Sequence, residues 1–118
     1  MFFNPLQIQL PVGAVTSITH RVTGMLLVLG IPFSIYLLDL SLQGPQGYAQ
    51  VIAWFDKLAF RVTAIVLIWA LAHHLLAGIR HLLSDIDVGS QLPAARRSAW
   101  TVNLGGVAVA LLAAGVLL

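Results

Sequence analysis

The sequence has 118 residues, of which 59% are hydrophobic and only 8% are charged, whereas an average soluble domain carries about 25% charged residues. A soluble fold of this length could not bury so much apolar surface, but a bilayer lets apolar side chains face lipid. The net charge of +2 does not indicate a nucleic-acid partner, and the absence of cysteine excludes disulfides, iron–sulfur ligation, thiolate zinc sites and covalently attached c-type haem. The composition therefore predicts an all-α integral membrane protein.

Three long apolar stretches follow one another along the chain, at about residues 22–42, 58–83 and 99–118. Each has roughly the 20 residues needed to cross about 30 Å of hydrocarbon at about 1.5 Å per residue. We therefore predict three transmembrane helices within a single membrane-anchor domain that covers residues 1–118. Pro32 should kink the first helix, which is tolerated where neighbours satisfy the freed carbonyl.

The two connections between the spans set the orientation of the chain. Residues 43–47, Gln-Gly-Pro-Gln-Gly, predict a chain break, and residues 48–57 look like an amphipathic segment at the membrane surface. The side that holds the N-terminus and the second connection carries four arginines, whereas the other side carries two basic residues: Arg21, Arg80, Arg96 and Arg97 against Lys57 and Arg61. The positive-inside rule then predicts a cytoplasmic N-terminus.

A first polar cluster opens the first span. Ser17, His20, Arg21 and Gly24 are spaced i, i+3, i+4 and i+7, which puts them on one face of a helix. A hydroxyl, an imidazole and a guanidinium on one face suit a polar head group that needs hydrogen bonds and protons. The alternative is that Arg21 reaches lipid phosphates while Ser17 caps the helix. The cluster alone does not choose between the two.

A second polar cluster closes the second span. His74, Gly78 and His81 fall at i, i+4 and i+7, and His74 lies about two turns inside the membrane. An ionisable residue at that depth is costly and is a functional candidate by default. A neutral imidazole is a good axial ligand for haem iron, and Gly78 would leave room for a flat macrocycle. The alternative is that His74 hydrogen-bonds a neighbouring helix.

His73 leaves the assignment of the ligand open. It is adjacent to His74, so its side chain points about 100° away around the helix. The spacing of His73 to Arg80 equals that of His74 to His81. Spacing alone therefore does not decide which of the two histidines would bind iron.

Both clusters lie in motifs that resemble a known family. The two motifs are residues 10–24, LPVGAVTSITHRVTG, and residues 73–85, HHLLAGIRHLLSD. They resemble the cytochrome b subunit of succinate dehydrogenase, which is the larger of the two membrane anchors of respiratory complex II. The resemblance covers essentially the whole chain. The sequence departs from the family pattern at two places. The segment before Pro11 is short, and His73 stands where an aromatic or small residue is common.

The resemblance implies a set of roles for individual residues. It implies a haem b shared with a second small anchor subunit, with His74 as one axial ligand of the iron and the other ligand from the partner. It implies that His20, Arg21 and His81 lie near the haem propionates, and that Ser17 and Arg21 bind ubiquinone. None of these residues would be catalytic by itself.

The resemblance also implies partners and a location. A flavoprotein and an iron–sulfur protein would dock on the cytoplasmic side of a bacterial inner membrane and deliver electrons from succinate, so the chain would not be an enzyme alone. Two alternatives remain: a b-type cytochrome that dimerises to bind haem with His74 from each copy, and a haem-free structural anchor. The motifs do not separate ubiquinone from menaquinone users, or succinate oxidation from fumarate reduction.

Overall fold

The computed structural model describes residues 12–86, 88 and 91–118, and four helices account for nearly all of them. They are α1 (Val12–Leu42), α2 (Pro45–Trp54), α3 (Leu58–Asp85) and α4 (Leu92–Leu117). The described part of the chain contains no strand, so the predicted all-α class is confirmed. Residues 10 and 11 of the first motif, and the short segment before them, lie outside the described residues.

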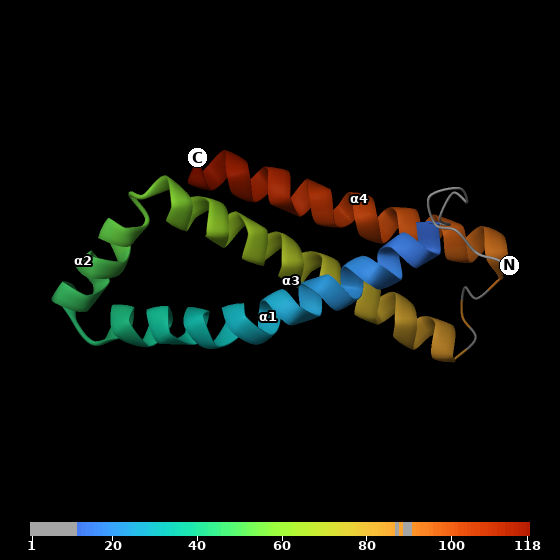
Figure 1. Cartoon of the computed structure of the whole chain (residues 1–118), viewed down its shortest axis with the longest axis horizontal. Coiled ribbons are helices and arrows are strands. Elements are labelled where there is room, and N and C mark those ends of the chain that lie inside the picture. The colour runs from blue at the N-terminus through green and yellow to red at the C-terminus, as the bar shows by residue number, and fades with distance from the viewer. Residues whose placement is uncertain (1–11, 87, 89–90) are drawn as a thin grey trace, which may run out of the picture.

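Three of the four helices are long and apolar enough to cross a membrane: α1, α3 and α4, with 31, 28 and 26 residues. They form an elongated bundle with a longest extent of 58 Å, in which α3 packs against both α1 and α4 and α1 crosses α3 partway along its length (Figure 1). Most of their large apolar side chains are exposed, which suits a protein whose surroundings are lipid or other membrane subunits. The prediction of a protein with three membrane-spanning helices is therefore confirmed.

Two of the helices begin earlier than their apolar stretches. Helix α1 begins at Val12 rather than near residue 22, and α4 begins at Leu92 rather than near residue 99. In a helix the backbone hydrogen bonds are made within the segment, so polar side chains such as Thr16 and Ser98 do not end it. The hydropathy of the sequence marks only the apolar part of each helix.

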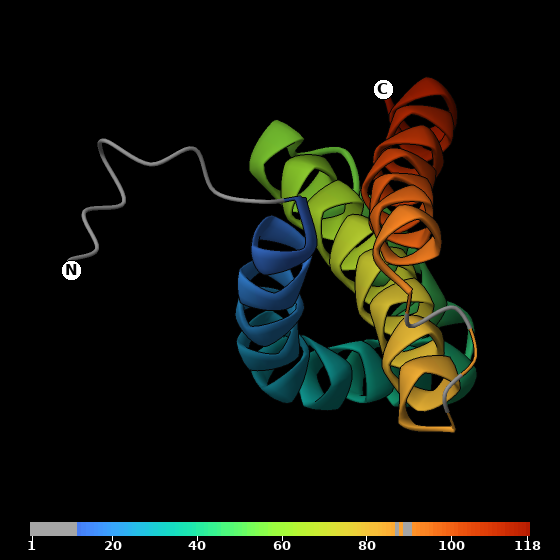
Figure 2. The same ribbon diagram turned by 90° about the vertical axis from the view of Figure 1, so that its right-hand side faces the viewer.

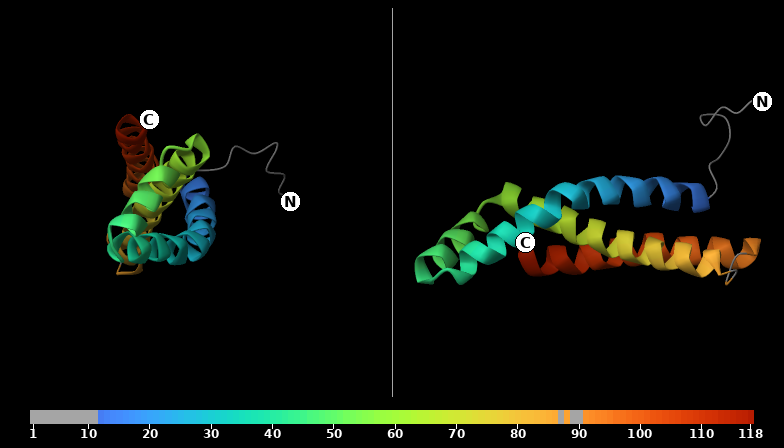
Figure 3. Two further views of the ribbon diagram at one scale, coloured as in Figure 1. Left: turned by 90° about the vertical axis from the view of Figure 1, so that its left-hand side faces the viewer. Right: turned by 90° about the horizontal axis from the view of Figure 1, so that it is seen from below.

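Helix α1 remains one helix through Pro32 and bends partway along its length (Figure 2), as a proline inside a helix predicts. The chain then breaks only at Gln43 and Gly44, because Pro45 already starts α2. Proline is well suited to the first turn of a helix, where its missing N–H has no partner to lose. Gly44 has φ 151°, a backbone conformation that side-chain-bearing residues rarely adopt. The short helix α2 folds back across the end of the bundle (Figure 3).

Small residues bring α3 and α4 close together. Ala70 and Ala77 of α3 are buried, as are Ala99 and Gly106 of α4. A Cβ atom on Gly106 would lie 3.3 Å from the Cβ of His73. Small side chains let helix backbones approach closely inside a membrane. This close contact places His73 of α3 directly against α4.

Candidate functional site

Three histidines gather at one end of the bundle, which we call the histidine end: His20 of α1 with His74 and His81 of α3. The rings of His20 and His74 stack with their centroids 4.2 Å apart and their planes 10° from parallel. The ring of His81 tilts against His20 at a centroid distance of 5.3 Å. The start of α1 and the end of α3 meet here because the two helices run in opposite directions (Figure 1). The structure thus brings together the two clusters that the sequence motifs define.

His74 is held by α1 through one ring nitrogen. Its Nδ1 atom lies 3.2 Å from the backbone carbonyl oxygen of His20 and 3.3 Å from the hydroxyl of Thr23. Both hydrogen bonds that the described residues make with this ring involve Nδ1. The other nitrogen, Nε2, is thereby left for another partner.

His73 faces a different helix. Its side chain is 2% exposed, and its Nε2 atom lies 3.0 Å from the carboxamide oxygen of Asn103 in α4. The hydroxyl of Thr16 in α1 lies 3.2 Å from the same oxygen, so the three long helices meet at Asn103. The Nδ1 atom of His73 is buried and has no hydrogen-bond partner within the described residues. Two adjacent histidines therefore contact different helices, one on each flank of α3.

The polar residues nearest the ends of the helices are more open. Ser17 and His20 are half-buried, whereas Arg21 and His81 are exposed. Arg80, in contrast, is turned toward α4, where its guanidinium donates to the Ser98 hydroxyl at 3.1 Å and to the Ala95 carbonyl at 3.3 Å. Arg80 therefore ties α3 to the first turns of α4.

Two glycines adjoin the stacked rings. A Cβ atom on Gly24 would lie 3.2 Å from the Cε1 atom of His74, and one on Gly78 would lie 4.0 Å from the Nε2 atom of His20. Gly24 thus lets the His74 ring approach the backbone of α1 closely. Gly78, one turn from His74 along α3, opens toward His20.

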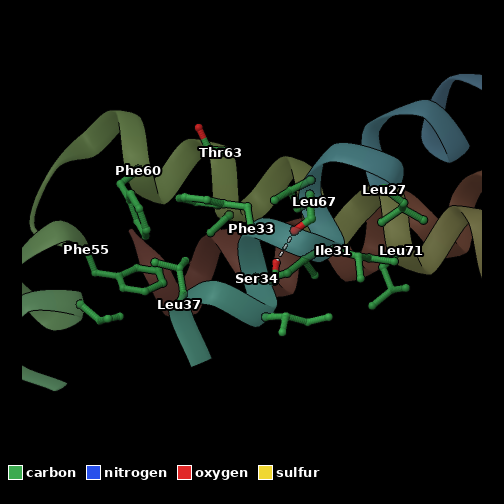
Figure 4. Close-up of a pocket in the computed structure, with 15 residues that line it drawn as sticks. Leu27, Ile31, Phe33, Ser34, Leu37, Phe55, Phe60, Thr63, Leu67 and Leu71 are labelled. Carbon is green, nitrogen blue, oxygen red and sulfur yellow. Dashed lines mark hydrogen bonds between the residues drawn. The ribbon is translucent and has the colours of Figure 1, made fainter. Parts of the chain in front are cut away.

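An apolar cavity of about 430 Å³ lies away from the histidine end, between α1, α2 and the first half of α3 (Figure 4). Its walls are mainly aliphatic and aromatic side chains, among them Leu27, Phe33, Phe55, Phe60 and Leu67. None of the four histidines lines it. This cavity and the polar cluster are therefore separate features of the molecule.

Three residues that contact the histidines or their partners were given no role from the sequence: Thr16 and Thr23, which lie within the first motif, and Asn103. The two threonines are fully buried, at 1% and 0% exposure, and all three contact a histidine or its partner. Threonine and asparagine in an apolar helix do signal an interhelical hydrogen bond. Their partners lie on other helices, so only the packed structure reveals them.

The described residues contain no group of three histidine, cysteine, aspartate or glutamate side chains that could hold a metal ion by themselves. At the histidine end, the rings of His20 and His74 are stacked rather than converging on one point. Stacked rings present their faces to each other, whereas two ligands of one ion must each aim a nitrogen at it.

Comparison with known proteins shows the family to which the chain is similar. Residues 4–114 match the family of succinate dehydrogenase/fumarate reductase transmembrane subunits. The succinate dehydrogenase cytochrome b556 subunit of Paracoccus denitrificans is 34% identical over 108 residues, which cover 88% of this chain and 80% of the relative.

A second relative agrees with the first. The succinate dehydrogenase cytochrome b556 subunit of Coxiella burnetii is 32% identical over 107 residues, which cover 90% of this chain and 85% of the relative. The resemblance that the two sequence motifs indicate is thereby confirmed. The chain belongs to the family of succinate dehydrogenase/fumarate reductase transmembrane subunits, among the cytochrome b subunits of succinate dehydrogenase.

Proposed function

We propose that this chain is the haem-carrying membrane anchor of a succinate dehydrogenase, in which His74 is an axial ligand of a b-type haem. The relatives are named cytochrome b556 subunits, which supports a b-type haem here. The observation that carries the assignment to His74 is the pair of Nδ1 contacts to α1, at 3.2 and 3.3 Å. These contacts leave Nε2 unengaged among the described residues, as an axial ligand requires.

The chemistry of the site fits this group. The lone pair of Nε2 lies in the plane of the imidazole, so the ring of His20 stacked on the face of His74 does not block it. A b-type haem supplies one-electron redox chemistry, and histidine is a common axial ligand of its iron. His73 fits less well, because its Nε2 atom is engaged by Asn103 and its Nδ1 atom is enclosed.

The remaining polar residues of the histidine end suit the periphery of the haem. The exposed side chains of Arg21 and His81, and the half-buried ring of His20, can supply cationic or hydrogen-bonding partners to propionates. The second axial ligand would come from a second small anchor subunit, because His20 stacks on the face of His74 and so does not aim a nitrogen at the same ion. Haem b would thus be shared between the two anchors.

We assign ubiquinone to the start of α1. Ser17 would hydrogen-bond a quinone carbonyl, and Arg21, one turn further along the helix, would stabilise negative charge on the reduced oxygen. Arg21 is exposed, so its guanidinium is accessible to a head group at the membrane surface. The chain itself would bind and orient the quinone, while electrons arrive from other subunits.

The family supports a proposal for the assembly as well. A flavoprotein and an iron–sulfur subunit would deliver electrons from succinate at the histidine end, on the cytoplasmic side of a bacterial inner membrane. The excess of arginine at that end, with Arg21, Arg80, Arg96 and Arg97, supports a cytoplasmic N-terminus. The absence of cysteine from this chain agrees with clusters held elsewhere.

The haem assignment is tested with two matched variants in the assembled complex, His74→Gln and His73→Gln. Each replaces an imidazole by an amide, and the amide introduced by His73→Gln can still donate to Asn103. We expect His74→Gln to remove or grossly shift the α-band in the reduced-minus-oxidised spectrum, and His73→Gln to leave that band in place. An unchanged band in the His74 variant would refute the assignment, and loss of the band in the His73 variant alone would transfer it to His73.

A further inference from the structure

The wall of α1 that faces His74 is built around Thr23. Its side chain is 0% exposed, and its hydroxyl lies 2.9 Å from the carbonyl oxygen of His20 and 3.3 Å from the Nδ1 atom of His74. The same carbonyl lies 3.2 Å from that Nδ1 atom. The three groups therefore form a closed triangle of hydrogen-bond contacts on one side of the imidazole.

The chemistry of this triangle fixes the tautomer of His74. A backbone carbonyl only accepts hydrogen bonds, so the His20 oxygen requires a hydrogen on the Nδ1 atom. The single hydroxyl hydrogen of Thr23 is used on the His20 carbonyl, at 2.9 Å, so its oxygen also accepts from Nδ1. Both contacts select the Nδ1–H form, in which Nε2 carries the free lone pair.

We propose that Thr23 is a positioning residue for His74: together with the His20 carbonyl it holds the imidazole in the Nδ1–H tautomer and sets the direction of Nε2. This inference deepens the proposed function and rests on it. Hydrogen bonds from the outer nitrogen of a ligating histidine fix its orientation and raise its basicity. Thr23 would therefore tune the haem through the ring of His74.

The decisive substitution is Thr23→Val, which keeps the shape of the side chain and removes its hydroxyl. Thr23→Ser keeps the hydroxyl and removes a methyl group. Thr19→Val is the matched control, because the Thr19 hydroxyl donates within its own helix, to the Val15 carbonyl 2.8 Å away. All three are made in the assembled complex.

Three readouts separate positioning from general packing. The midpoint potential of the haem should rise in Thr23→Val, because a less basic ligand stabilises oxidised iron less. The low-spin EPR signal should shift, because the His74 ring loses one of its two hydrogen-bond acceptors and its plane can rotate. Haem transfer to excess apomyoglobin should become about 10- to 100-fold faster, as for the loss of other groups that support a metal ligand. Thr23→Ser and Thr19→Val should match the parent complex in all three.

A second variant covers the case in which Thr23→Val does not assemble. Thr23→Ala removes the same hydroxyl and leaves a smaller side chain, so it loses the contact to the Nδ1 atom of His74 without placing a new methyl group against the ring. It should shift the EPR signal in the same complex.

Parent-like potential, EPR signal and haem transfer in Thr23→Val would overturn the inference. If Thr23→Val does not assemble, a parent-like EPR signal in Thr23→Ala would overturn it. Failure of the proposed function gives a different result. The reduced-minus-oxidised spectrum of the haem would then be unchanged in His74→Gln, independently of the results for the Thr23 variants.

Discussion

His73 and His74 are neighbours in sequence, yet their hydrogen bonds give them opposite tautomers. The Nε2 atom of His73 donates to the oxygen of Asn103, whereas the Nδ1 atom of His74 donates to the carbonyl of His20. Adjacent positions on a helix point about 100° apart, so one ring reaches α4 and the other reaches α1. His73 is therefore suited to joining helices, and His74 is suited to binding a group through Nε2.

The quinone assignment makes a prediction at the same scale. Ser17→Ala should lower quinone reduction by up to about tenfold, because one neutral hydrogen bond contributes about 0.5–1.5 kcal/mol. Arg21→Leu should lower it by up to about a hundredfold, because charge-assisted hydrogen bonds are roughly twice as strong. Succinate oxidation by an artificial dye, measured on the same membranes, should be retained in both.

The control for this pair is Ser41→Ala. Ser41 lies at the far end of α1, where its hydroxyl donates to the Leu38 carbonyl at 2.7 Å. This variant should keep full quinone reduction. Unchanged quinone kinetics in the Ser17 and Arg21 variants would remove the quinone site from the start of α1.

The sequence predicts part of this site and leaves part of it hidden. Helical spacing alone aligns His74 with His81, and Ser17 with Arg21. It does not distinguish His74 from His73, because the deciding partners, Thr23 and Asn103, lie on other helices and 51 and 30 positions away. Nor does spacing reveal the stacking of His20 on His74, which requires the antiparallel packing of α1 and α3.

At the scale of the helices, the three spans follow directly from hydropathy, whereas their first turns do not. Helix α1 gains ten residues and α4 gains seven beyond their predicted starts at residues 22 and 99, since they begin at Val12 and Leu92. Those extra turns carry Thr16, Ser17 and Ser98, so hydropathy misses the turns that carry polar contacts of the histidine end. Backbone hydrogen bonding, rather than side-chain polarity, sets where these helices begin.

The close contact of α3 with α4 makes a prediction for Gly106. A leucine there would meet the His73 Cβ and the Trp69 indole nitrogen, both 3.3 Å from the position of a Cβ atom. Overpacking of this kind typically costs about 1–3 kcal/mol. Gly106→Leu should therefore lower the thermal midpoint of the purified complex. Gly115→Leu is the matched control, because nothing in the described structure lies within 4 Å of a Cβ atom there. Equal losses in the two variants would contradict the account of this contact.

The whole molecule is a thin bundle whose apolar side chains are mostly exposed, including Met25, Val28 and Leu29 of α1 and Leu75 and Leu82 of α3. Its histidines lie toward one end, and its apolar cavity lies away from that end. Because its two ends differ, the molecule has a defined orientation in the membrane. This orientation determines on which side of the membrane the histidine end lies.

Single cysteines test that orientation, because the chain contains none of its own. Ser84→Cys marks the exposed end of α3 beside the histidine cluster, and Gln46→Cys marks the start of α2 at the other end. In sealed inside-out membrane vesicles, a membrane-impermeant maleimide should label Ser84→Cys and spare Gln46→Cys. The reverse pattern would place the N-terminus outside.

The central claim is that this chain carries haem as the anchor of a succinate dehydrogenase, and purification of the tagged chain from its native membrane tests it most directly. We expect a flavoprotein, an iron–sulfur protein and a second small membrane subunit to co-purify, together with a b-type reduced-minus-oxidised spectrum. A b-type spectrum without flavin or iron–sulfur subunits would instead indicate a homodimeric cytochrome. An intact, active complex without haem would contradict the claim outright.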